Sequence, residues 1–433
     1  MHEDEKNLEK WKEAIEKQEI PKVPLETAIL KGFHRARDKR AKRTVRKRGL
    51  WTIVAAAVLM LTFITSIRVS PVFANAIASI PGMSVIVDMI QDNKGLQMAI
   101  ENEHYQAIGV SGESKSFKVT LEGLITDENG LIIFSSAAQK NSNQIQFSSV
   151  RVLDQNGVPI SKNGSYSFNY PELTHTAELE FETKIPTDEL LIEYTFSKDE
   201  EEASETIQIP FKIELKPIKK EQYIINETVE VKGQKIHIRS ITIGSLKTAI
   251  EVEYDAENTM KIFGFEDLRL EDEKGEVWTS IQNGVTARGS DNPNVMTYYL
   301  QSNYFRQTDH LTLKFNKLMA MDREDAFIII DTDKKEIIRQ PKDKRFRNMT
   351  VHRGGYVEFE LRGEEGYHHD PFSTIIDAQG KELRMMSGYF SRKEEDRISI
   401  GFDLPDEAYT NPLKLPLAGY PSYITGNVSV EIK

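Results

Sequence analysis

The pattern of apolar and polar positions changes three times along the chain, and its most marked feature is an uninterrupted apolar run. Residues 50–67 read LWTIVAAAVLMLTFITSI and contain no charged residue. A helix needs roughly 20 mainly apolar residues to cross a hydrocarbon core about 30 Å thick. The run reaches this length if Arg68 extends its charged end to the interface and Val69 is included. We therefore predict a transmembrane helix over residues 50–69, with Trp51 at one border.

The charges on either side of this run predict its orientation. Basic residues crowd the N-terminal side between Lys31 and Arg48, whereas only Arg68 lies close on the other side. Positive charge next to an apolar segment resists translocation, so the N-terminus is expected in the cytoplasm and the long C-terminal part outside.

The apolar run has two other interpretations. A buried core helix is disfavoured because the run follows the basic sequence RTVRKRG directly. A cleavable signal peptide would use the small residues Ala74 and Ala76 around Asn75, but its basic region would then extend over residues 1–48. We favour a retained membrane anchor.

Before the anchor, residues 1–49 contain two short segments with helical spacing, separated by Pro21-Lys22-Val23-Pro24. Proline does not continue a helix and restricts the residue before it. Each segment carries one apolar stripe, too small to form a core alone, so we predict a cytoplasmic tail whose helices fold on a partner. A loosely ordered juxtamembrane tail is the alternative. The candidate partner-binding residues are Leu8, Trp11, Ile15, Leu25, Ile29 and Phe33.

After the anchor, residues 70–105 are too apolar for a simple linker. Pro81-Gly82 separates two short helical patterns, over residues 74–80 and 84–90, and a third pattern covers residues 96–101. This segment is predicted either to pack on the domains that follow or to lie along the bilayer surface, and the sequence leaves both open.

From about Ser114 the apolar positions alternate with polar ones. Examples are Phe117, Val119 and Leu121; Ile207, Ile209 and Phe211; Leu311, Leu313 and Phe315; Ile398, Ile400 and Phe402; and Val428, Val430 and Ile432. Such alternation is typical of antiparallel strands with one buried and one solvated face. We predict a mainly β fold, without the helical segments that a parallel α/β sheet would require.

One hairpin recurs three times in this β region. The segments VRVLDQNGVPI, LRLEDEKGEVW and STIIDAQGKEL each place Asp three residues before Gly, at Asp154/Gly157, Asp272/Gly275 and Asp377/Gly380. Asp at the first and Gly at the fourth position suit a type I turn in which the carboxylate accepts local N–H groups. The spacing of about 110 residues is that of one β sandwich. Prolines and basic residues near 213–223 and 335–347 suggest boundaries, so we predict three serial immunoglobulin-like β-sandwich modules at 106–216, 217–340 and 341–433.

The net charge differs between the two sides of the apolar run, as expected for a chain whose two parts lie in different environments. The net charge is −11, but residues 1–48 hold fifteen Lys and Arg against nine Asp and Glu, so the remainder is strongly acidic. A basic tail suits the anionic inner leaflet, and an acidic exterior part argues against nucleic-acid binding. The absence of cysteine excludes disulfides, thiol redox chemistry and every cysteine-containing zinc site.

The sequence contains few patterns typical of catalysis or metal binding. His368-His369-Asp370 is the one tight cluster of metal-ligand types, and a surface loop explains it better because adjacent strand residues point to opposite faces. The acidic run 199–202 lacks the spacing of a calcium loop. No zinc-protease, nucleophile-elbow, P-loop or dinucleotide motif occurs in a suitable context. We predict no enzyme activity, no cofactor and no metal site.

Three short motifs around the post-membrane segment carry a family resemblance. They are Ser70-Pro71-Val72-Phe73-Ala74, Ile80-Pro81-Gly82-Met83 and Lys94-Gly95-Leu96-Gln97, followed by KVTLEGLITDENGLIIF. Together they resemble a family of single-pass Gram-positive membrane proteins that is classed as a domain of unknown function. Its members are often labelled anti-sigma factors or negative effectors of an extracytoplasmic-function sigma factor. The match is specific over residues 10–140 and less so over 220–433.

The resemblance implies that the cytoplasmic tail binds a sigma factor and that the exterior part responds to the cell envelope. Zinc-containing anti-sigma factors use a His…Cys-x-x-Cys site, which a chain without cysteine does not form, so the expected contact is metal-free. The expected partners are an extracytoplasmic-function sigma factor, the membrane, and an envelope component or protein outside the cell. The alternative function is that of a membrane-anchored envelope-binding or structural protein without a signalling role.

Overall fold

The computed structural model describes residues 83–433 with short gaps, all within the unit Val69–Lys433. The gaps are 91, 141–145, 161–162, 170–172, 182–183, 186–188, 198–204, 215–217, 282–285, 354, 364–366, 368, 384, 386–387, 395 and 406. The predicted cytoplasmic tail, membrane helix and partner-binding residues therefore lie outside the described residues. Among the residues that are described, no helix is both long and apolar enough to cross a membrane.

The described chain is mainly β, as the alternation predicted, and its first two-sheet module follows two short helices. One sheet has the order β1-β2-β3-β6-β5 and the other β4-β7-β8. Leu121 and Ile133 from the first sheet share a core with Ile192 and Ile209 from the second. The elements are α5 (Met83–Ile90), α6 (Lys94–Glu101), β1 (Tyr105–Glu113), β2 (Phe117–Thr126), β3 (Gly130–Gln139), β4 (Gln146–Leu153), β5 (Asn163–Asn169), β6 (Thr174–Glu180), β7 (Glu189–Ser197) and β8 (Glu205–Lys212).

The second module also has two sheets around one core. Its sheets have the orders β15-β16-β11-β10-β9 and β12-β17-β13-β14, and β27 pairs with β17. Trp278 is fully buried between them. The strands are β9 (Glu221–Val231), β10 (Gln234–Ile243), β11 (Lys247–Tyr254), β12 (Met260–Phe265), β13 (Arg269–Asp272), β14 (Val277–Trp278), β15 (Ala287–Gly289), β16 (Val295–Gln301), β17 (Leu311–Asp322) and β27 (Tyr423–Glu431).

The third module is built from the chain between β17 and β27. Its sheets have the orders β19-β18-β26-β22-β23 and β20-β21-β25-β24, and they share a core rich in Phe and Tyr. The elements are the 3₁₀ turn η1 (Arg323–Asp325), β18 (Phe327–Asp331), β19 (Glu336–Arg339), β20 (Phe346–Val351), β21 (Tyr356–Arg362), β22 (Ile375–Ile376), β23 (Glu382–Leu383), β24 (Gly388–Glu394), β25 (Arg397–Asp403) and β26 (Leu413–Pro416).

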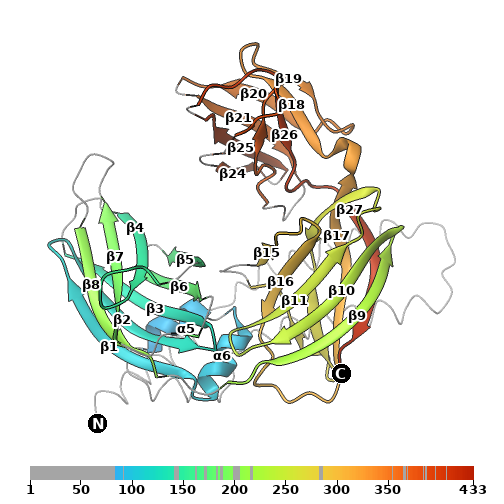
Figure 1. The fold of residues 1–433 in the computed structure, drawn as a ribbon. Helices are drawn as coiled ribbons and strands as arrows, with labels where there is room; N and C mark the ends of the chain where they lie inside the picture. The colour runs from blue at the N-terminus through green and yellow to red at the C-terminus, as the bar shows by residue number, and fades with distance from the viewer. Residues whose placement is uncertain are drawn as a thin grey trace, which may run out of the picture. The chain divides into compact units, whose positions relative to one another are not determined.

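The third module is thus inserted into the second, which differs from the predicted serial boundary at 340/341. Figure 1 shows β27 beside β17, among the strands of the second module. The long strand β17 crosses between two cores: Phe315 belongs to the second module's core and Met319 to the third module's core. The proline and basic residues at 341–345, which suggested a linker, form a turn between β19 and β20 inside the third module.

The three predicted Asp-x-x-Gly turns are confirmed with one shared geometry. The N–H groups of Gly157, Gly275 and Gly380 each donate to the carbonyl of the turn's Asp at 3.0 Å. In each turn, Oδ1 of Asp154, Asp272 or Asp377 accepts two further backbone N–H groups at 2.8–2.9 Å. All three glycines have positive φ, between 76° and 83°. The carboxylate and the glycine therefore fix the same turn in each module.

The positive φ of Gly275 makes a substitution testable. Gly275→Val is expected to destabilise the second module by about 1–3 kcal/mol, because a β-branched residue tolerates the left-handed region poorly. Nothing lies within 4 Å of the added Cβ, so backbone strain rather than a clash is the cause. Lys274→Val, at an exposed position of the same turn, is the matched control for chemical denaturation. Equal stability of the two variants would contradict the turn assignment.

Candidate functional site

The two helices that precede the first strand are packed on the β modules. Asn93 caps α6, and its side-chain Oδ1 accepts the N–H of Leu96 at 3.1 Å. Leu96, Ala99 and Ile100 form the buried stripe of α6, and Ile86 and Ile90 form that of α5. We call α5 and α6 the stalk helices, since they follow the predicted membrane segment. The sequence left open whether this segment packs on the domains that follow or lies along the bilayer surface. Its described part packs on the β modules.

A small apolar core joins these helices to both of the first two modules. It combines the helical stripes with Ile125, Ile132 and Phe134 of the first module and with Leu246 from the β10–β11 loop of the second. On β3, Leu131 and Ile133 face the sandwich core whereas Ile132 and Phe134 face the helices. Both faces of this strand end are buried, which explains why the sequence GLIIF shows no alternation.

Polar contacts fasten the start of α6 to the second module. The backbone N–H of Lys94 donates to Gln301 Oε1 at 3.0 Å, and Gln301 Nε2 donates to the Asp92 carbonyl at 3.0 Å. Lys94 Nζ also donates to the Val277 carbonyl at 3.2 Å. Gly95 lies directly against Ser302, where an added Cβ would be 2.6 Å from the Ser302 nitrogen. Only a residue without a side chain fits at this position.

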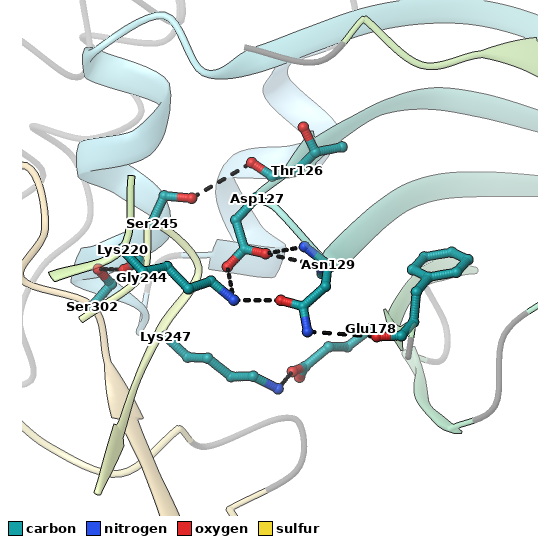
Figure 2. A network of polar contacts seen from close by, with 11 residues as sticks. Thr126, Asp127, Asn129, Glu178, Lys220, Gly244, Ser245, Lys247 and Ser302 are labelled. Atoms are coloured by element: carbon teal, nitrogen blue, oxygen red, sulfur yellow. Dashed lines mark hydrogen bonds and ion pairs between the residues drawn. The ribbon is translucent and has the colours of Figure 1, made fainter. Parts of the chain in front are cut away.

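Ion pairs border the contact between the two modules. Lys247 Nζ lies 2.7 Å from Glu178, Lys220 Nζ lies 3.6 Å from Asp127, and Arg288 pairs with Glu180. Figure 2 shows Lys220 reaching both Asp127 and Asn129, with the Lys247–Glu178 pair beside them. In all three pairs the acid belongs to the first module and the cation belongs to the second module or to the segment that leads into β9. The two surfaces are therefore complementary in charge.

The residues around these pairs form the junction, the contact region of the stalk helices with the first and second modules. Burial on its own would lower the pKa of Lys247, but the charge and hydrogen bond of Glu178 outweigh it and raise the pKa. A cavity of about 110 Å³ lies here, lined by Asp127, Glu178, Lys220, Lys247 and Tyr299, among others. Its volume suits a few water molecules, at about 30 Å³ each. The acidic and basic groups that line it pair with one another, so the arrangement is that of a structural joint.

The cluster His368-His369-Asp370, which the sequence singled out, is placed in part. His369 Nε2 lies 3.6 Å from Glu266, and Asp370 Oδ1 accepts the Phe372 N–H at 3.1 Å. Burial raises the pKa of Asp370. Among the described residues, no group of three or more His, Asp and Glu side chains is arranged to hold a metal ion.

Sequence reasoning and structure thus point to different residues. The predicted partner-binding residues, from Leu8 to Phe33, lie outside the described part of the chain, so their role stays a prediction. The junction was not predicted. One signal was available: the continuous apolar run Leu131–Phe134 beside Asp127-x-x-Gly130, where alternation stops.

Comparisons with known proteins found no match among curated sequences. Among solved structures, the chain resembles the crystal structure of the conserved domain protein from Bacillus anthracis, with 14% identity over 54% of this chain and 84% of that one, at a TM-score of 0.36. A marsupial T cell receptor covers 75% of this chain and 100% of its own, with 7% identity and a TM-score of 0.18. Both likenesses are too low to carry an argument.

Two families of unknown function match separate parts of the chain. Residues 220–361 match a family of unknown function (DUF5643). Residues 44–138 match a domain of unknown function (DUF4179), a range that includes the predicted membrane segment, the stalk helices, β1, β2 and most of β3. The chain is therefore similar, over these two ranges, to two families whose function is not known.

Proposed function

We propose that the protein is a single-pass membrane regulator of the anti-sigma-factor type. In this proposal the cytoplasmic tail binds an extracytoplasmic-function sigma factor, residues 50–69 span the membrane, and the acidic immunoglobulin-like modules bind or sense an envelope component outside. The match of residues 44–138 to a domain of unknown function is consistent with the family resemblance from which the sigma-factor role was inferred.

The observation that carries the proposal is the position of the stalk helices. They are the first described elements after the predicted membrane segment, and they are built into the junction between two β modules. A change in how the modules meet can therefore act on the stalk helices, which residues 70–82 connect to the predicted membrane segment. A protein whose β modules served only as an anchored binding surface would have no need for such a connection.

The cytoplasmic half of the proposal rests on the two apolar stripes of the tail. Amphipathic helices with apolar anchors at i, i+3 or i+4 and i+7 commonly dock into grooves of a partner. Trp11 is the expected dominant contact, because buried aromatic residues concentrate interface energy.

A pull-down with the full-length, detergent-solubilised chain tests the proposal. The bait is the chain, and the prey is a candidate extracytoplasmic-function sigma factor from the same organism. Trp11→Ala combined with Ile29→Ala is expected to reduce capture by more than about tenfold, since each truncated anchor costs about 2 kcal/mol. The matched control is Lys12→Ala with Thr27→Ala, which changes neighbouring positions off the apolar stripes and should leave capture unchanged.

Two outcomes would reject the regulator. Equal capture by the wild-type chain and the Trp11/Ile29 variant would remove the tail as the binding element. No capture by the wild-type chain would favour the alternative, a membrane-anchored envelope-binding or structural protein.

A further inference from the structure

Helix α6 makes contact with both of the first two modules, which also meet through ion pairs, the β10–β11 loop and the ring of Phe305 against that of His104. Its apolar stripe packs on the first module, and its first turn is bonded to Gln301 and packed on Ser302 of the second. Leu246, the buried apolar side chain from the second module in the shared core, and Phe305, which packs against that core, contact a surface of which the stalk helices form a part. The apolar part of the junction is therefore incomplete without α6.

The ion pairs across the junction are contacts that water can replace. Lys247–Glu178, Lys220–Asp127 and Arg288–Glu180 are charged groups that become hydrated when they separate. The attraction within such partly buried pairs is offset by the cost of removing both charges from water, so they contribute little net stability. Apolar side chains have no such compensation, so the packing around α6 opposes separation of the modules.

We infer that α6 holds the first and second modules in contact. The two modules stay together only while α6 is docked between them, and separation of the modules releases the stalk helices. This inference goes beyond the proposed function and does not depend on which cytoplasmic partner the tail binds. The regulatory movement would then depend on one contact, in which Gly95 and Lys94 of α6 meet the residues at the end of β16.

Gly95 offers a test in which two physical effects have opposite signs. Alanine is a better helix former than glycine, so Gly95→Ala should strengthen α6 as a helix. The added Cβ would, however, lie 2.6 Å and 2.8 Å from backbone atoms of Ser302, which cannot move aside as a flexible side chain could. Gly95→Ala is therefore expected to open the junction only if the docking of α6 on Ser302, and not the stability of α6 as a helix, holds the two modules together.

The experiment uses the full-length chain, whose lack of cysteine permits clean spin labelling. Labels at Ser148→Cys on β4 and Glu227→Cys on β9, both exposed positions, report the distance between the modules. Wild type should give one narrow distance distribution and Gly95→Ala a broad one. Hydrogen exchange should show about tenfold weaker protection of α6 amides, with β10 unchanged.

Two further variants complete the comparison. Gln301→Ala removes both hydrogen bonds to the start of α6 and should broaden the distribution in the same way. Gly289→Ala, where the added Cβ would have an ordinary contact of 3.6 Å with Met296 Sδ, should match wild type. Narrow distributions with full α6 protection in both Gly95→Ala and Gln301→Ala would overturn the inference. Loss of hydrogen-exchange protection in β10 as well as in α6 would also overturn the inference. The contact would then be required for the second module to fold, and it would not control opening of the junction.

Discussion

Removing residues 423–433 is expected to unfold the second module while the strands of the third module stay folded. These residues carry β27, which pairs with β17 in the second module from Thr312↔Glu431 to Met319↔Tyr423. A serial arrangement with a boundary at 340/341 would predict the opposite, namely damage to the third module alone. The truncation therefore distinguishes an inserted module from a serial one.

The expected effect is large because β27 supplies core residues as well as hydrogen bonds. Val428 and Val430 are buried in the second module's core, and Ile424 and Ile432 pack against it. Burial of a valine side chain is worth about 1.5–3 kcal/mol, and removal of the strand also leaves β17 without one of its partners. The sum is comparable with the total stability of a domain, about 5–15 kcal/mol.

Neighbouring positions on β27 provide a point-mutation version with a matched control. Val430→Asp places a carboxylate in the core and should destabilise the second module by several kcal/mol, about as much as any buried unpaired charge. Ser429→Asp lies on the exposed face of the same strand and should have little effect. Limited proteolysis with mass spectrometry of the fragments would locate the unfolded region. Protection of residues 221–322 in the truncated chain would contradict the insertion.

Excision of the insertion tests the same topology from the other side. The N–H of Ala320 donates to the Ser422 carbonyl at 2.9 Å, so the two strands are adjacent where the third module departs. Replacing residues 321–421 by Asn-Gly, a two-residue sequence suited to a hairpin turn, should leave the second module folded.

The first module should lose stability between pH 6.5 and pH 4 because of His175. This residue of β6 is 2% exposed, with the rings of Phe147 and Tyr194 at 4.9 and 5.9 Å. Burial lowers the pKa of His175 from 6.5 to about 4. In this interval the unfolded chain binds a proton that the folded chain does not, so the free energy of unfolding falls as the pH falls. The loss is on the order of 3 kcal/mol over the whole interval.

A comparison of variants separates this effect from that of the many carboxylates. Thermal unfolding of His175→Phe should depend less steeply on pH than that of wild type between pH 6.5 and 4, and the two curves should converge in slope above pH 7. His310→Phe, at an exposed position, is expected to keep the wild-type dependence. An unchanged slope in His175→Phe would show that the histidine takes up a proton as readily in the folded module as in the unfolded chain.

The β class and the turns could be predicted because their signals are local. A strand with one buried face alternates apolar and polar residues, as Leu311, Leu313 and Phe315 do, and all three are fully buried. The turns at Asp154, Asp272 and Asp377 depend on a carboxylate and a glycine only three residues apart. The third helical pattern, over residues 96–101, likewise corresponds to α6.

The pairing of strands could not be predicted in the same way. Alternation in β27 indicates that Val428 and Val430 face a core, but two cores were available, and nothing within the strand distinguishes them. β17 serves both, through Phe315 at one end and Met319 at the other. Proline and basic residues such as those at 341–345 are typical both of a turn within a module and of a linker between modules. The sequence alone therefore suggests a boundary at this position.

The mainly β class, the three equivalent turns and the short helices after the apolar run follow from local sequence alone, because each depends on residues a few positions apart. The insertion of the third module into the second, and the position of α6 between the first two modules, emerge only in the folded chain. Those features depend on contacts such as Lys94 with Gln301 and Asp127 with Lys220, between residues about 90 to 210 positions apart. Alternation of apolar and polar residues indicates that one face of a strand is buried. Which other element covers that face is determined only in the folded chain.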